Sequence, residues 1–211
     1  MSRSAATVLS PGVSWSLPVA RSQGAPAPRL DHPTLAGRLT ELSGVGAAAV
    51  LTLTFTVVQE IQQRGEPVAW VMSGESLFYP PDVSDSGVDC EALVVVRVPD
   101  ALSIARAAEI LAHSGAFGLV ILDLGVQAQI PMPLQARLLH AAQRHDMVVL
   151  CLTDTRQHLP SLGSLVSLRL ETCRQPLADG HYRCEGIARK DKRYGPGWRD
   201  GATYAPPLGL C

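Results

Sequence analysis

The chain of 211 residues lacks a strong excess of charge, because its 18 lysines and arginines are balanced by 19 acidic residues, for a formal net charge of −1. A protein that binds nucleic acid through its overall charge usually carries a basic excess, so this composition argues against that class. Hydrophobic residues nevertheless make up 46% of the chain. That fraction is enough for a buried core and argues against a disordered protein.

Closely spaced cysteine pairs and long apolar runs are also absent. The five cysteines, Cys90, Cys151, Cys173, Cys184 and Cys211, are odd in number and contain no C-x-x-C pair. This spacing fits reduced thiols better than a disulfide framework or a zinc site. Residues 1–17 show no signal-peptide pattern, and the most apolar stretch, residues 47–58, is too short to span a bilayer. We therefore expect a soluble, cytoplasmic protein without a metal or a membrane partner.

Composition divides the chain into three parts. Residues 1–36 are rich in Ser, Pro, Ala and Gly, which predicts a flexible N-terminal arm. Residues 37–193 alternate strand and helix patterns and are expected to form one α/β domain. Residues 194–211 are rich in Gly and Pro and are expected to form an irregular C-terminal tail.

Apolar strands alternate with amphipathic helices in the central part. Strand patterns occupy residues 38–42, 67–72, 117–122 and 147–152, and helical patterns occupy residues 47–63, 101–113 and 134–144. This alternation is typical of a parallel sheet that helices cover on both faces. Two later strand patterns, residues 165–171 and 181–189, are joined by a turn without a helix. The sequence therefore predicts a mostly parallel sheet with an antiparallel C-terminal edge.

The end of the first strand pattern has the position of a phosphate-binding P-loop. Gly44 fits the first glycine of G-x-x-x-x-G-K-[ST], but Ala49, Val50 and Leu51 occupy the second glycine, lysine and hydroxyl positions. The lysine would contact the β- and γ-phosphates and the hydroxyl would bind magnesium, and valine and leucine can do neither. One interpretation is an anion site at the amides of the helix start. We favour the other, a helix N-terminus that is simply packed against the sheet.

Two carboxylates follow other strand patterns. Asp123 stands where a Walker B aspartate would hold magnesium, and Glu75 stands where a general base would activate water. Each has a simpler interpretation, because Asp123 can cap a helix or bond within a loop and Glu75 can be solvated. Without the lysine and the hydroxyl we favour the simpler interpretations. We therefore expect neither catalysis nor a bound cofactor.

Several segments, taken in order, resemble the core of the bacterial RecA recombinase. They are residues 33–44 (PTLAGRLTELSG), 69–80 (AWVMSGESLFYP), 86–100 (SGVDCEALVVVRVPD), 114–123 (SGAFGLVILD), 164–171 (SLVSLRLE) and 189–196 (RKDKRYGP). The resemblance covers about residues 33–197. It implies a RecA-like core in which Glu75 matches the catalytic glutamate and Asp123 the Walker B aspartate.

The departures from RecA resemble a narrower group. The P-loop lysine and hydroxyl are absent, and Asp154 stands near the glutamine that couples nucleotide to DNA in RecA. The connections 125–133 and 153–163, where RecA carries its DNA-binding loops, are short and hold few basic residues. This combination is similar to the ImuA proteins and the related SulA group. ImuA proteins accompany an ImuB protein and an error-prone polymerase in damage-induced translesion synthesis.

One basic and aromatic cluster lies near the C-terminus. It contains Lys190, Lys192, Arg193 and Trp198, with Arg189, Tyr194 and Arg199 among them. In RecA filaments the matching lysines reach the neighbouring subunit's nucleotide, so the resemblance implies that Lys190 and Lys192 face a RecA protomer. Two alternatives stay open. One is nucleic-acid contact with a base stacked on Trp198, and the other is a solvated loop with a packed tryptophan.

The sequence and the resemblance together predict a non-catalytic, RecA-like regulator of the DNA-damage (SOS) response. It would bind RecA and limit recombination, or support translesion synthesis with ImuB and an error-prone polymerase, with weak or absent DNA binding. One alternative is a DNA-binding accessory protein that uses the cluster at residues 189–199. Another is a cell-division inhibitor like those of the SulA group.

Overall fold

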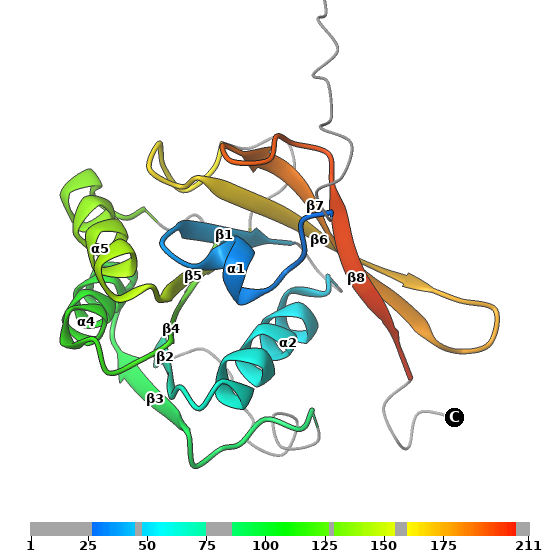
Figure 1. The fold of residues 1–211 in the computed structure, drawn as a ribbon, viewed down its shortest axis with the longest axis horizontal. Helices are drawn as coiled ribbons and strands as arrows, with labels where there is room; N and C mark the ends of the chain where they lie inside the picture. Colours follow the sequence, from blue (N-terminus) through cyan, green and yellow to red (C-terminus); the bar gives the residue numbers. More distant parts are fainter. Residues whose placement is uncertain (1–26, 45–47, 75–85, 127–128, 155–159, 206–211) are drawn as a thin grey trace, which may run out of the picture.

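In a computed structural model the described residues are 27–44, 48–74, 86–126, 129–154 and 160–205. Within these ranges one sheet contains eight strands in the order β3-β2-β4-β5-β1-β6-β7-β8 (Figure 1). The strands are β1 (Leu39–Ser43), β2 (Val68–Ser73), β3 (Leu93–Val98), β4 (Leu119–Gly125), β5 (Val148–Thr153), β6 (Leu168–Pro176), β7 (Tyr182–Asp191) and β8 (Arg199–Tyr204). Strands β1 to β6 pair in parallel, whereas β7 pairs antiparallel with both β6 and β8. The predicted α/β fold with an antiparallel C-terminal edge is confirmed.

Helices cover both faces of the parallel part of the sheet. They are α1 (His32–Leu35), α2 (Val50–Gln63), α4 (Ala101–Ser114) and α5 (Met132–His145). On one face Leu53 and Ile61 of α2 share a core with Leu42 of β1. On the other face the residues of α4 and α5 form a second core with the opposite sides of the strands (Figure 1). Among the described helices none is both long and apolar enough to cross a bilayer.

Local chemistry sets the helix boundaries. Helix α4 begins where the Asp100 carboxylate accepts a hydrogen bond from the Ser103 N–H at 2.8 Å, and it ends at Gly115, which has φ +66°. Helix α2 begins after Ala49, which offers no side-chain cap. We expected this helix to begin at Ala47, and without a capping side chain the alanine run gives no signal for its first turn.

The segment over residues 27–36 differs from the flexible arm expected for residues 1–36. Leu30 and Leu35 are buried in the core beside α2. The Glu60 carboxylate accepts a hydrogen bond from the His32 N–H at 3.0 Å, and the Asp200 carboxylate accepts one from the Leu30 N–H at 2.6 Å. Two leucines and two carboxylates distant in sequence therefore hold this segment against the domain.

The tail expected to be irregular from residue 194 contains strand β8. This strand pairs with β7 although its sequence has no apolar alternation. A Cβ atom at Gly201 would come within 2.1 Å of the Cys184 carbonyl oxygen, so the close approach of the two strands needs a glycine there. Sequence patterning assigns no element to β3 either, although Leu93 to Val96 form an apolar run.

Candidate functional site

The structure places the P-loop position at the carboxyl end of β1, beside the first turn of α2. Ala49 is fully buried, Val50 packs against the core, and the Leu51 side chain is 51% exposed. The first turn of α2 therefore offers neither a cation nor a hydroxyl where a lysine and a magnesium ligand would stand. Its N–H groups receive no side-chain cap. Residues 45–47 of the same loop lie outside the described residues.

Gly44 is explained by close packing at this position. Its N–H donates to the Thr153 carbonyl at 3.1 Å, which extends the β1–β5 ladder by one bond. A Cβ atom on Gly44 would lie 2.5 Å from Ala48 Cβ and 2.6 Å from Thr172 Oγ1. Such distances are shorter than any comfortable contact, so a side chain would force the loop away from β6. The local packing thus accounts for a glycine here without a bound phosphate.

Asp123 is half-buried in β4, close to its carboxyl end. Burial raises the pKa of its carboxyl, the nearby Trp70 side chain lowers it, and the charge of Asp154 raises it. Glu75, the second expected carboxylate, lies outside the described residues. Within the part of the chain that the structure describes, no three His, Cys, Asp or Glu residues gather as a metal site. The two carboxylates that lie near one another at this edge of the sheet are those of Asp123 and Asp154.

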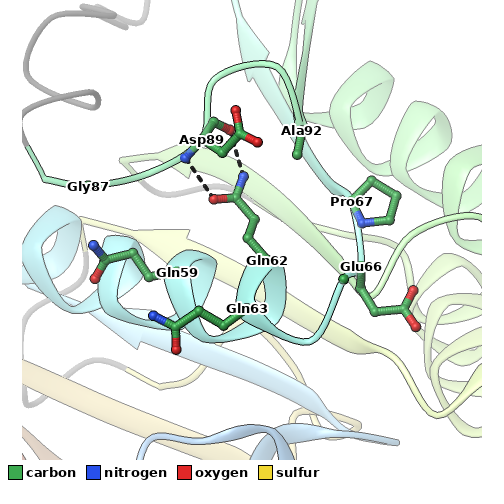
Figure 2. Close-up of a pocket in the computed structure, with 9 residues that line it drawn as sticks. Gln59, Gln62, Gln63, Glu66, Pro67, Gly87, Asp89 and Ala92 are labelled. Atoms are coloured by element: carbon green, nitrogen blue, oxygen red, sulfur yellow. Dashed lines mark hydrogen bonds between the residues drawn. The ribbon is translucent and has the colours of Figure 1, made fainter.

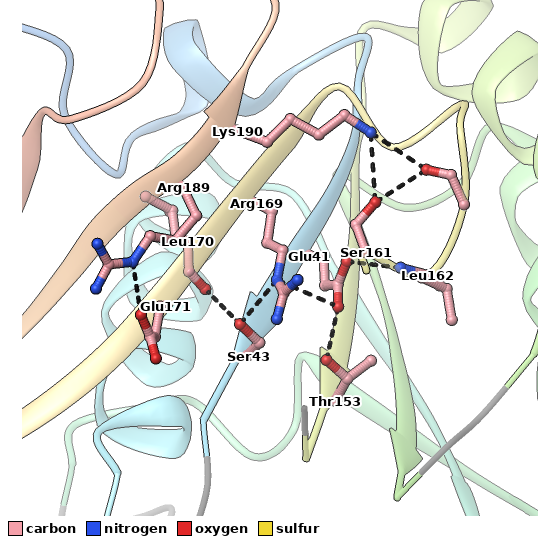
Figure 3. Close-up of polar contacts among 11 residues, drawn as sticks. Glu41, Ser43, Thr153, Ser161, Leu162, Arg169, Leu170, Glu171, Arg189 and Lys190 are labelled. Atoms are coloured by element: carbon pink, nitrogen blue, oxygen red, sulfur yellow. Dashed lines mark hydrogen bonds and ion pairs between the residues drawn. The ribbon is translucent and has the colours of Figure 1, made fainter. Parts of the chain in front are cut away.

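A buried polar cluster lies beside this edge, on β1, β5 and β6 (Figure 3). The fully buried Glu41 carboxylate accepts hydrogen bonds from Thr153 Oγ1 and from the Leu162 N–H, both at 2.9 Å. Arg169 Nε lies 3.8 Å from the same carboxylate and donates to Ser43 Oγ at 3.2 Å. This cluster fastens the chain after residue 160 to the centre of the sheet.

The predicted partner-binding cations lie against the chain's own backbone. Lys190 Nζ donates to Ser161 Oγ and to the Gly163 carbonyl, both at 3.3 Å (Figure 3). Burial, and then the charge of Lys192, lower the pKa of the Lys190 ammonium. Lys192 Nζ donates to the Ser164 carbonyl at 2.8 Å. The two lysines therefore hold residues 161–164 in place.

Arg193 and Trp198 are also held within the chain. Arg193 Nη1 donates to the Pro33 carbonyl at 3.2 Å and so ties the segment after β7 to α1. The half-buried Trp198 packs against the core, and its indole N–H donates to the Asp191 carboxylate at 2.8 Å. This placement favours the interpretation of a packed tryptophan over that of an exposed stacking platform.

Asp191 forms a buried ion pair that sequence reasoning missed. Its carboxylate lies 2.6 Å from Arg38 Nη2, and the two side chains are 0% and 4% exposed. Burial alone would raise the pKa of Asp191, but hydrogen bonds from the N–H of Arg193 and from Arg38 and Trp198 lower it overall. Neither partner stands out in the sequence, because Asp191 lies between Lys190 and Lys192 and Arg38 lies between Gly37 and Leu39. The pairing itself is invisible because its members are distant in sequence.

A pocket of about 450 Å³ lies at the far end of α2 (Figure 2). Its lining includes Gln59, Gln62, Gln63, Glu66 and Asp89. The Gln62 amide donates to the Asp89 carbonyl at 2.7 Å and accepts from the Asp89 N–H at 2.9 Å. Because both polar ends of Gln62 are used, we assign it the structural role of holding the segment that leads into β3.

Comparison with known proteins gives partial matches. No family model matches the chain. It is 30% identical over 131 residues to the protein RecA of Thermus aquaticus, which covers 56% of this chain and 38% of that protein. It is 32% identical over 120 residues to RecA of Chlorobium chlorochromatii, which covers 51% of this chain and 33% of that protein. It is 34% identical over 95 residues to RecA of Aquifex aeolicus, which covers 45% of this chain and 27% of that protein. The chain thus spans about a third of the length of these relatives.

Among solved structures, the flagellar accessory protein FlaH of Methanocaldococcus jannaschii has a similar fold. The TM-score is 0.57 at 10% identity, and the match covers 81% of this chain and 86% of that one. At this identity the likeness concerns the fold alone. The chain is therefore RecA-like in part of its sequence, and its fold is of the RecA-like α/β type.

Proposed function

We propose that this chain is a non-catalytic, RecA-like regulator that binds RecA in the DNA-damage response. The observation that carries the proposal is the first turn of α2, where Val50 packs against the core and Leu51 replaces a hydroxyl, in a chain similar to RecA over 131 residues. Phosphoryl transfer depends on the P-loop lysine and on a magnesium ion held by the P-loop hydroxyl. A chain without either group would not turn over ATP.

Loss of ATP chemistry in an otherwise preserved core suggests how such a regulator acts. A RecA-like protomer that kept a filament interface but not the nucleotide site would add to a filament and stop its growth. The resemblance to ImuA supports a finer version, in which the protein works with ImuB and an error-prone polymerase. In that version it would shift repair from recombination towards translesion synthesis.

A RecA strand-exchange assay with and without the full chain is the decisive experiment. We expect strand exchange to fall at amounts of the chain well below those of RecA, because one added protomer blocks each filament end. Titration calorimetry with Mg-ATP should give no heat of binding. Undiminished strand exchange would contradict the RecA proposal, and measurable ATP binding would contradict the non-catalytic part.

The predicted interface can be tested with Lys190→Ala/Lys192→Ala. Pull-down with RecA should weaken for this variant and should be unchanged for Arg64→Ala, which removes an exposed cation at the end of α2. Because the two lysines also hold residues 161–164, thermal unfolding of the variant must be compared with that of the parent. Unchanged RecA binding would show that the interface lies elsewhere on the chain.

The alternative of a DNA-binding accessory protein has less support from the contacts. The cations of the C-terminal cluster bond to acceptors of the same chain, among them Arg189 to Glu171 and Arg199 to Glu185. Retention on DNA that falls steeply with salt would favour this alternative. RecA binding that survives high salt would favour the proposed function.

A further inference from the structure

A groove of about 520 Å³ is lined by residues of α4 and α5. These two helices lie on the sheet face opposite α2 (Figure 1). Four of its lining residues, Arg106, Glu109, Ile110 and His113, come from α4, and Arg137 comes from α5. None of these residues belongs to the P-loop position or to the C-terminal basic cluster. The groove is therefore separate from the surfaces discussed above.

The apolar part of the groove is Ile110. Its side chain is 72% exposed, although α4 already buries Ile104, Ala105 and Ala108 against the sheet. Leu102, two turns earlier, is exposed as well. A large exposed aliphatic side chain beside a hollow offers an anchoring position for an apolar residue of a partner.

The charged part of the groove is basic. Arg137 Nη2 donates to the Glu109 carboxylate at 3.2 Å and Arg137 Nε pairs with it as well, so these two charges neutralise each other. Among the described residues Arg106 forms no hydrogen bond or ion pair, and the carboxylate that feels its charge, Asp100, already caps α4. The groove thus presents one uncompensated guanidinium next to an exposed isoleucine.

We propose that this groove docks an acidic amphipathic segment of a partner protein. An aliphatic side chain of the segment packs on Ile110, and a neighbouring carboxylate binds Arg106 through paired, charge-assisted hydrogen bonds. Nucleic acid offers Ile110 no aliphatic chain, only the methyl group of thymine, and a basic segment would meet a like charge. Two copies of the chain joined by this face about a twofold axis would bring two basic surfaces together. The inference does not depend on the proposed function.

Two fluorescein-labelled peptides of one length test the proposal. Both form an amphipathic helix with leucines along one face, flanked by glutamates in the first peptide and by lysines in the second. We expect fluorescence anisotropy to show binding of the glutamate peptide and not of the lysine peptide. Arg106→Glu should weaken binding at least about tenfold, as expected when a desolvated charge contact becomes repulsive. Ile110→Glu should weaken it as strongly.

Arg144→Glu is the matched control, because Arg144 is an exposed arginine near the end of α5 and outside the groove. Its binding should equal that of the parent, and thermal unfolding of all three variants should show that they fold. Equal binding of the two peptides, no binding at millimolar peptide, or an equal loss in Arg144→Glu would overturn the proposal. So would self-association of the chain that Ile110→Glu abolishes, since a second copy would then occupy the groove. RecA pull-downs with the same variants keep this result distinct from the proposed function.

Discussion

Replacing Arg38 by methionine tests the buried ion pair with Asp191. The arginine donates to the Asp191 carboxylate at 2.6 Å and to the Thr34 carbonyl at 3.3 Å. It also donates to Ser167 Oγ and to the Ser167 carbonyl, both at 2.9 Å. Methionine keeps most of the aliphatic volume and removes every donor. Asp191 would then remain buried as an anion with the Trp198 indole N–H and two backbone N–H groups.

Removing one partner of a buried ion pair costs about 3–5 kcal/mol, because the remaining charge is left without compensation. Three donors still reach Asp191, so we expect the lower end, about 3 kcal/mol. For a protein of this size each kcal/mol lowers Tm by about 2–4 °C, which gives a fall of roughly 6–12 °C. This loss is a large fraction of the roughly 5–15 kcal/mol by which a folded protein is typically more stable than its unfolded state.

Urea unfolding followed by circular dichroism measures this loss, and Arg199→Met is the matched control. Arg199 pairs with Glu185 at 2.9 Å, but its side chain is 59% exposed, so the expected loss is at most about 1 kcal/mol. Equal losses for the two arginine variants would refute the reasoning. A second check is Arg38→Met/Asp191→Leu, which removes both charges and should be less destabilised than the sum of its single variants.

Three further outcomes follow from the contacts. Asp191 has a lowered pKa in the folded chain, so its contribution to stability is present above about pH 4 and is lost as the pH falls through the folded pKa. The difference in unfolding free energy between the parent and Asp191→Asn should therefore shrink in acid. A difference that stays constant with pH would contradict this. Gly44→Ala should cost about 1–3 kcal/mol, because its Cβ atom would lie 2.5 Å from Ala48 Cβ; unchanged urea unfolding would disprove the close packing. Burial raises the pKa of the Cys151 thiol, whereas Cys90 is exposed. A thiol reagent should therefore label Cys90 at once and Cys151 only on unfolding. Rapid labelling of both cysteines would show that β5 opens readily.

Strands β1, β2, β4 and β5 could be predicted because they are buried on both faces. Strands β4 and β5 are therefore nearly continuous apolar runs, and the intervening helix α5 keeps a clear helical period. Strand β8 could not be predicted in this way. It forms because β7 offers an unpaired edge and Gly201 fits against it, and both causes arise only once the chain has folded.

In the candidate site, the altered P-loop position could be predicted from the sequence, whereas the contacts of the basic cluster could not. A motif compares residues that are close in sequence, so Val50 and Leu51 stand out where a lysine and a hydroxyl are expected. Lys190 stands out equally well as part of a basic cluster, but its acceptors on Ser161 and Gly163 come from another segment. Composition shows that a cation is present, and tertiary structure decides which acceptor it contacts.

The central place of β1 has a consequence for synthesis of the chain. Leu39–Ser43 leaves the ribosome before both of its neighbours, since it pairs with Val149–Thr153 on one side and with Leu168–Glu171 on the other. Until those segments emerge, β1 has two unpaired edges, each able to pair with another nascent chain. The pairings of β1 also slow folding, because they join distant parts of the chain. We therefore expect this protein to depend on chaperones that shield nascent chains.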